Sequence, residues 1–159
     1  MSTVAVVRHA KSDRPPGVAD FYRPLRTRGI RDARVGGDWL RDTIGRPELV
    51  ISSPARRAAQ TASALLEAYG DDPPPIRYED RLYSASVTDL LDVVAELTDT
   101  PVALVGHNPS VTELVGALTG EHLELRTCGI AVISLEPAAS GIPRGAGTLL
   151  SSSTPRAGG

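Results

Sequence analysis

Short, continuous apolar runs recur along this chain and are separated by longer segments of mixed polarity. The runs at 3–7, 49–52 and 102–105 are rich in valine and other aliphatic residues, and a polar or small residue follows each of them. Runs of this length, bounded by turn signals, are typical of strands that are buried on both faces. The pattern also predicts strands at 128–135 and 147–152 and an extended segment at 76–83.

Segments with helical features alternate with these runs. Pro54 and Pro109 stand where proline favours the first turn of a helix, and alanine is frequent after Pro54. The pattern predicts helices at 27–45 with Thr27 as the N-cap, at 56–69, at 86–97 with Ser86 or Thr88 as the cap, and at 110–118. Because strands alternate with helices, the predicted fold class is α/β with a mainly parallel sheet.

Chemically active residues stand at the ends of three of the predicted strands. Arg8 and His9 close the first run, Arg57 lies in the first helical turn after the second, and His107 follows the third. In a parallel sheet these strand ends share one edge, which is where ligands bind. A histidine there can act as nucleophile, base or metal ligand, and guanidinium groups pair with phosphate oxygens. Together they predict a pocket for a phosphate dianion.

Composition limits the classes of protein to consider. The chain has 159 residues, 41% hydrophobic and 23% charged, and no apolar run approaches the roughly 20 residues of a membrane helix. We expect one domain over 1–152, a disordered tail over 153–159, a cytoplasmic location because no signal-like segment begins the chain, and no membrane partner. A net charge of −2 argues against nucleic acid, and the single cysteine, Cys128, excludes an internal disulfide.

Three motifs in order resemble those of a known family. Arg8-His9-Ala10 resembles the Arg-His-Gly signature of the histidine phosphatase superfamily, which includes the cofactor-dependent phosphoglycerate mutases. The segments 52–62 and 105–109 resemble its second and third motifs, and the arginine directly before alanine, Arg57 rather than Arg56, matches the second. The segment 22–29 and the short chain point to the SixA-type phosphohistidine phosphatases.

The resemblance implies a single-domain three-layer α/β/α sandwich without a capping subdomain, since no large insertion separates the second motif from residue 79. It implies that His9, as a neutral imidazole, attacks phosphorus and becomes a phosphohistidine. Arg8, Arg57 and His107, the last best as an imidazolium, would stabilise the phosphoryl oxygens, and Asn108 would join them in binding substrate. The implied enzyme is a metal-independent phosphatase that uses no cofactor and no metal ligand.

The sequence offers two candidates for the general acid. Asp80 is the better candidate and Glu79 the next, although SixA-like members lack a clear acid at this place. An alkoxide leaves poorly without a proton donor, whereas an imidazole with a reference pKa of about 6.5 takes its proton from solvent near neutral pH. A weak or absent acid and an uncapped site therefore favour a phosphorylated protein side chain, above all phosphohistidine, as the substrate.

Other functions remain open at this point. The alternatives are a small-molecule phosphomonoesterase of the same superfamily, acting on a small phosphoester, and a phosphate- or phosphoprotein-binding module without turnover, which the intact His9 disfavours. A dinucleotide-binding module lacks its glycine fingerprint here, and a metal hydrolase lacks clustered carboxylates. The arginines between Arg23 and Arg34 are interpreted as a solvated helix face.

Overall fold

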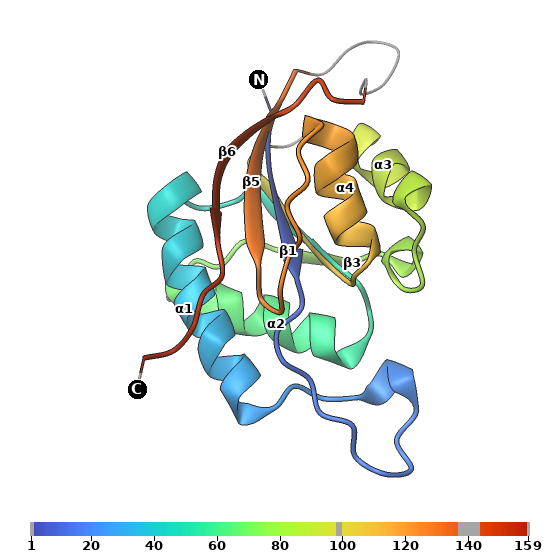
Figure 1. The fold of residues 1–159 in the computed structure, drawn as a ribbon. Helices are drawn as coiled ribbons and strands as arrows, with labels where there is room; N and C mark the ends of the chain where they lie inside the picture. Colours follow the sequence, from blue (N-terminus) through green and yellow to red (C-terminus); the bar gives the residue numbers. More distant parts are fainter. Residues whose placement is uncertain (1, 98–99, 137–143, 159) are drawn as a thin grey trace.

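A six-stranded sheet forms the centre of the molecule (Figure 1). The computed structural model describes residues 2–97, 100–136 and 144–158. The strand order is β3-β2-β4-β1-β5-β6. The strands are β1 (Ser2–Arg8), β2 (Leu49–Ser52), β3 (Ile76–Tyr78), β4 (Val102–Gly106), β5 (Ile130–Leu135) and β6 (Thr148–Ser153). The neighbours β3, β2, β4 and β1 pair in parallel, so their carboxyl ends meet at one edge, as the strand pattern predicted.

Helices cover both faces of this sheet and complete the three layers. The helices are α1 (Thr27–Ile44), α2 (Arg56–Leu66), α3 (Val87–Ala95) and α4 (Ser110–Thr119). Short 3-10 turns lie at Asp20–Tyr22, Glu67–Tyr69 and Asp80–Leu82. The single-domain α/β fold with a mainly parallel sheet is thereby confirmed. Within the described ranges, no helix combines the length and apolarity that crossing a bilayer requires.

The side chains of β1 show why its sequence is continuously apolar. Val4 and Val6 pack into the core formed with α3 and α4, whereas Ala5 and Val7 pack into the core formed with α1 and α2. Alternate residues of a strand point to opposite faces, so a strand covered on both sides has no polar face. The apolar run therefore ends where the strand leaves the core, and this places Arg8 and His9 at the edge of the sheet.

The structure corrects several local boundaries and orientations. The strands β5 and β6 run antiparallel to their neighbours, which makes the sheet mixed. The N-cap of α1 is Arg26, and Thr27 is already inside the helix. The strand β3 ends at Tyr78, and a 3-10 turn replaces the extended segment expected up to residue 83. By contrast, Ser86 caps α3 through a reciprocal capping box with Asp89.

The C-terminal segment also differs from the expected disordered tail. Ser153 is the last residue of β6, and the backbone N–H of Ala157 donates to Oδ1 of Asp32 on α1 at 2.8 Å. Asp32 is only 2% exposed, and a buried carboxylate requires such donors. Residues 154–158 consequently pack against α1, while Gly159 lies outside the described residues.

Candidate active site

A polar cavity of about 360 Å³ opens at the carboxyl edge of the parallel strands. It brings together side chains from the ends of β1 and β4, the start of α2 and the loop between β1 and α1. The lining residues are Arg8, His9, Lys11, Ser12, Arg14, Asp20, Arg23, Arg57, His107, Asn108 and Thr127. Four of the five residues expected to be catalytic therefore meet in one cavity, the exception being Asp80.

His9 is held in one tautomer by its own backbone neighbourhood. Its Nδ1 lies 2.8 Å from the carbonyl oxygen of Ala10, and a carbonyl can only accept, so Nδ1 carries the proton. The other ring nitrogen, Nε2, then has a free lone pair. Burial, together with the nearby positive groups, lowers the pKa of His9 to about 3, although the Ala10 hydrogen bond opposes the shift. His9 is thus neutral at physiological pH, with a lone pair on Nε2.

The backbone around His9 is fixed from three directions. The N–H of His9 donates to Gly106 on β4, its carbonyl accepts from Cys128, and the N–H of Ala10 donates to Oγ1 of Thr61 on α2. Among the described non-glycine residues, positive φ angles occur at Ser84 and Cys128, so Ala10 keeps an ordinary backbone conformation. Alanine in place of the family's glycine therefore costs nothing here in backbone strain.

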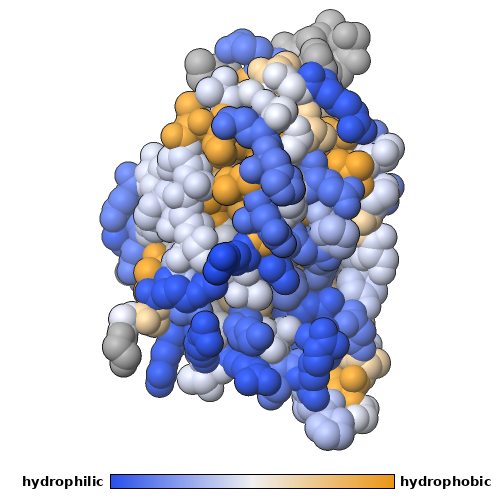
Figure 2. Space-filling model, in the orientation of Figure 1, coloured by the Kyte–Doolittle hydropathy of each residue, from blue (hydrophilic) through white to orange (hydrophobic). Residues whose placement is uncertain are grey.

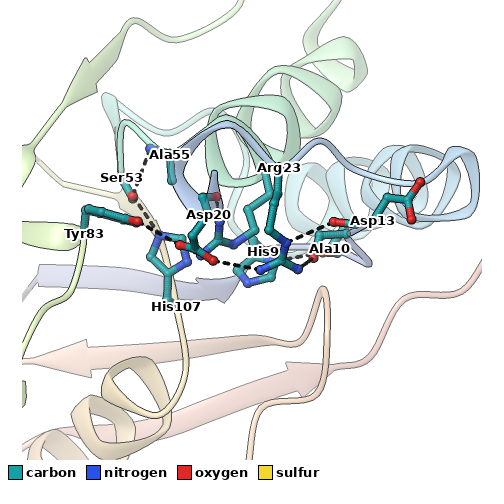
Figure 3. Close-up of polar contacts among 11 residues, drawn as sticks. His9, Ala10, Asp13, Asp20, Arg23, Ser53, Ala55, Tyr83 and His107 are labelled. Atoms are coloured by element: carbon teal, nitrogen blue, oxygen red, sulfur yellow. Dashed lines mark hydrogen bonds and ion pairs between the residues drawn. The ribbon is translucent and has the colours of Figure 1, made fainter. Parts of the chain in front are cut away.

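His107 lies beside His9 in the same cavity. The ring centroids are 5.1 Å apart, and His107 Nε2 lies 2.8 Å from Oγ of the buried Ser53 (Figure 3). Burial, followed by the charge of Arg57, lowers the pKa of His107 to about 4. Burial and this charge favour the neutral imidazole, whereas the expected stabilisation of phosphoryl oxygens uses the imidazolium. A phosphate dianion would raise this pKa, since an opposite charge favours the charged form.

The two arginines that the sequence pattern predicts at the site reach the cavity from different elements. Arg57, the second residue of α2, is 7% exposed, and its Nη1 and Nη2 donate to the backbone and the carboxylate of Asp20 at 2.7 and 3.1 Å. Arg8 donates from Nη1 to the carbonyl of Leu125. The Nε of Arg8 is buried without a partner among the described residues. Such a donor is costly to leave unpaired, and a phosphate oxygen would satisfy it.

Asp20 is the carboxylate of the cavity, and the sequence interpretation missed it. Its side chain accepts from the Tyr83 hydroxyl at 2.7 Å, from Arg23 at 2.9 Å and from Arg57 at 3.1 Å (Figure 3). These hydrogen bonds, with that of Tyr83 the largest contribution, hold the pKa of Asp20 well below its usual range. Asp20 is therefore an ionised residue that positions two arginines, not a proton donor at neutral pH.

Arg23 is a second residue that the sequence interpretation misplaced. Its guanidinium donates to the Asp13 carbonyl, the Ser12 hydroxyl and the Asp20 carboxylate, and the residue is only 9% exposed. It is thus part of the cavity wall and not of a solvated helix face. The signal was present, because Arg23 belongs to the segment 22–29 that carried the SixA-type resemblance.

Asp80, the expected general acid, lies outside the cavity. Asp80 is exposed at the start of a 3-10 turn and does not line the cavity, and Glu79 is paired with Arg81 at 2.8 Å. The turn instead directs Tyr83 toward the site, where its ring centroid is 5.8 Å from that of His107. The resemblance to the family suggested an acid at 80, but the local 3-10 geometry decides which residue of this segment faces the pocket.

Asn108 lines the cavity, although much of its amide is already engaged. Its Nδ2 donates to the Leu125 carbonyl at 2.8 Å, and its Oδ1 accepts from the backbone and hydroxyl of Thr112. These bonds tie the start of α4 to the loop that also receives Arg8.

The described residues contain no group of three or more histidine, cysteine or carboxylate side chains that could hold a metal ion.

The geometry supports chemistry on phosphorus. A neutral histidine with one free nitrogen faces a cavity in which guanidinium groups provide fixed positive charge. Phosphoryl transfer needs an in-line nucleophile and stabilisation of the equatorial oxygens, and little else from the protein. The site is built for these two tasks.

Comparison with known proteins agrees with this interpretation. Residues 4–91 match the model of the histidine phosphatase superfamily, branch 1. An uncharacterized protein of Mycobacterium tuberculosis H37Rv is 34% identical over 163 residues, covering 94% of this chain and 100% of its own. A structure of a candidate phosphohistidine phosphatase, SixA, from Agrobacterium tumefaciens is 31% identical with a TM-score of 0.82, covering 97% and 98% of the two chains.

Two further structures extend this likeness. The protein histidine phosphatase SixA in complex with tungstate is 26% identical with a TM-score of 0.80, over 96% of this chain and 97% of that one. A mycobacterial glucosyl-3-phosphoglycerate phosphatase is 19% identical with a TM-score of 0.70, over 94% of this chain and 97% of that one. At this level of identity the likeness shows only that the two proteins have the same fold.

Proposed function

This chain belongs to the histidine phosphatase superfamily and is a phosphate-hydrolysing enzyme, and we propose that it hydrolyses a phosphorylated protein side chain, with phosphohistidine favoured. The state of Asp20 carries the proposal. It is the one carboxylate among the described lining residues, and it is ionised and engaged by Tyr83, Arg23 and Arg57. A site whose carboxylate holds no proton suits a leaving group that is protonated from solvent, as an imidazole is.

In the first step the lone pair of His9 Nε2 forms a bond to phosphorus while the P–N bond of the substrate breaks. The departing imidazole nitrogen takes the electron pair of that bond and a proton from solvent. In the second step a water oxygen bonds to phosphorus, and the electron pair of the P–N bond returns to His9. Both protons of that water leave with the product as dihydrogen phosphate. One water is consumed, and the products are inorganic phosphate and the dephosphorylated histidine side chain.

Fixed positive charge assists both steps. Arg8 and Arg57 would donate to the equatorial oxygens, which carry the charge in the transition state. His107 would join them once bound phosphate raises its pKa and makes it an imidazolium. Asp20 keeps the guanidinium of Arg57 oriented, so that the donors do not have to reorganise when the substrate arrives.

We expect the two acidic residues to differ in their effect on activity. Asp80→Asn should change kcat/KM less than about twofold, because Asp80 lies outside the cavity. Asp20→Asn should lower kcat/KM by about 10²-fold, since a neutral amide holds Arg57 and Arg23 less firmly. The measurement is kcat/KM for a phosphohistidine peptide and for a phosphoserine peptide of the same sequence in all three proteins.

The same data test the substrate. The wild type should prefer the phosphohistidine peptide. A preference for phosphoserine, or for a small phosphoester, by orders of magnitude would support the alternative of a small-molecule phosphomonoesterase. If Asp80→Asn slowed the phosphoserine peptide selectively, Asp80 would be the general acid after all.

We also expect turnover without a divalent metal. The arginines supply the positive charge that a metal ion supplies in other phosphatases. Dialysis against a chelator should leave kcat unchanged, with a zinc-dependent phosphatase treated in parallel as a control. Loss of activity that zinc or magnesium restores would overturn the mechanism above.

A further inference from the structure

We propose that Lys11 and Arg14 form a second anion subsite at the mouth of the cavity, which binds a carboxylate of the protein substrate close to its phosphorylated residue. The inference rests on the proposed function, and it assigns a role to two cationic side chains that the phosphoryl chemistry does not use. Both residues line the cavity with His9, and both are exposed.

The cavity holds more positively charged side chains than one phosphoryl group requires. Arg8 and Arg57 are assigned to the phosphoryl oxygens, and the guanidinium of Arg23 is occupied by three protein acceptors. Within the described part of the chain, Lys11 and Arg14 make no ion pair, although the molecule as a whole has a net charge of −2. Positive charge therefore remains at the mouth after the phosphoryl group is bound.

The two acidic residues of the same loop, Asp13 and Asp20, are engaged by other groups. Asp13 accepts from the backbone N–H of Arg14, and its side chain lies 3.5 Å from Arg26. Asp20 is shared among Arg23, Arg57 and Tyr83. The guanidinium of Arg14 and the ammonium of Lys11 thus stay available for an external carboxylate.

The backbone that carries both cations is fixed relative to His9. Arg26 N–H donates to the carbonyl of Lys11 at 2.9 Å, and Asp13 N–H donates to Pro24 at 2.8 Å. A Cβ at Gly29 would collide with the carbonyl of Lys11, so α1 packs directly against this loop. Because their backbone is fixed, the two cations can bind an acidic side chain only within a limited range of distances from the phosphoryl group.

The surroundings of the mouth suit a protein rather than a small metabolite. The same loop exposes 39% of Val18 and 62% of Tyr22, and exposed aromatic side chains are typical of protein interfaces. Hydrophilic residues dominate the lower part of the molecular face in Figure 2, with an apolar patch at its lower right edge. A phosphorylated protein with acidic residues beside its phosphohistidine matches this combination of charge and apolar surface.

The test uses three phosphohistidine peptides that are identical except for the two residues on each side, which are Glu, Gln or Lys. Wild-type kcat/KM should fall in that order, with a Glu-to-Lys ratio of about 10 at low salt that shrinks at 0.5 M NaCl. Lys11→Gln with Arg14→Gln should bring the ratio near one. Lys11→Glu with Arg14→Glu should reverse it, which a merely structural role could not do.

The matched control is Arg31→Glu. Arg31 is an exposed arginine on α1 that does not line this cavity, so the same change of charge should leave the peptide ratio unchanged. A ratio that shifts equally in Arg31→Glu would reduce the effect to net charge and overturn the subsite, as would a ratio unaffected by the double variants.

The result also separates the subsite from the proposed function. If no phosphohistidine peptide is hydrolysed but phosphoserine peptides are, the substrate proposal fails. The same three flanks on phosphoserine then test the subsite by the same ratio, and a preference for Glu that the double variants reverse supports it.

Discussion

Replacing His9 with alanine should abolish turnover, with kcat lowered by at least about 10⁴-fold, as expected when a nucleophile is removed. Its free Nε2 is the only group placed by the proposed mechanism to form a bond to phosphorus. The arginines would still bind phosphate in the variant, so affinity for inorganic phosphate should survive while turnover does not. Binding measured by calorimetry, beside kcat, separates these two effects.

Rapid quench gives the direct evidence for the intermediate. With a ³²P-labelled phosphohistidine peptide, the wild type should show acid-labile, base-stable label on His9, and His9→Ala should show none. His122→Ala is the matched control, because His122 is exposed and does not line the cavity. Normal turnover by His9→Ala would refute the assignment of the nucleophile.

The second large effect is expected from the adjacent arginines at the start of α2. Arg57→Ala should lower kcat/KM by about 10² to 10³-fold, the magnitude typical of a lost electrostatic stabiliser. Arg56→Ala should have little effect, because Arg56 is exposed and lines a separate groove between α1 and α2. Neighbouring residues of a helix point about 100° apart, so the two cannot serve the same phosphate.

Arg57→Lys makes this comparison more specific. Lysine keeps the charge but not the planar fork that donates to Asp20, so activity should recover only in part. Thermal melting of each variant checks that the fold is intact. Equal losses in Arg56→Ala and Arg57→Ala with unchanged melting temperatures would contradict the geometry described here.

The pattern of apolar runs is enough to predict three of the parallel strands and the place of His9 at the sheet edge. A strand covered by helices on both faces must be apolar throughout, so β1, β2 and β4 are visible as continuous runs. The polar residue at the end of such a run must lie at the sheet edge. This local rule places His9, Arg57 and His107 together without any knowledge of the tertiary structure.

The antiparallel pairing of β5 with β1, and of β6 with β5, has no such local signature. An apolar run predicts a strand but not its direction, which the connections between the elements decide.

The order of the C-terminal segment was also not predictable from its sequence. Residues of small and polar type suggested disorder, yet the buried carboxylate of Asp32 binds Ala157 across 125 positions of sequence.

Which carboxylate lines the site, and how far the histidine pKa values are shifted, depends on contacts between distant parts of the chain. Asp20 meets Arg57 and Tyr83 across 37 and 63 positions, whereas Asp80, which lies closer to the second motif, remains outside. Hydrogen bonds over such separations leave no periodic pattern in the chain. The low pKa values of His9 and His107, about 3 and 4, come from burial, which arises only when the surrounding elements have packed.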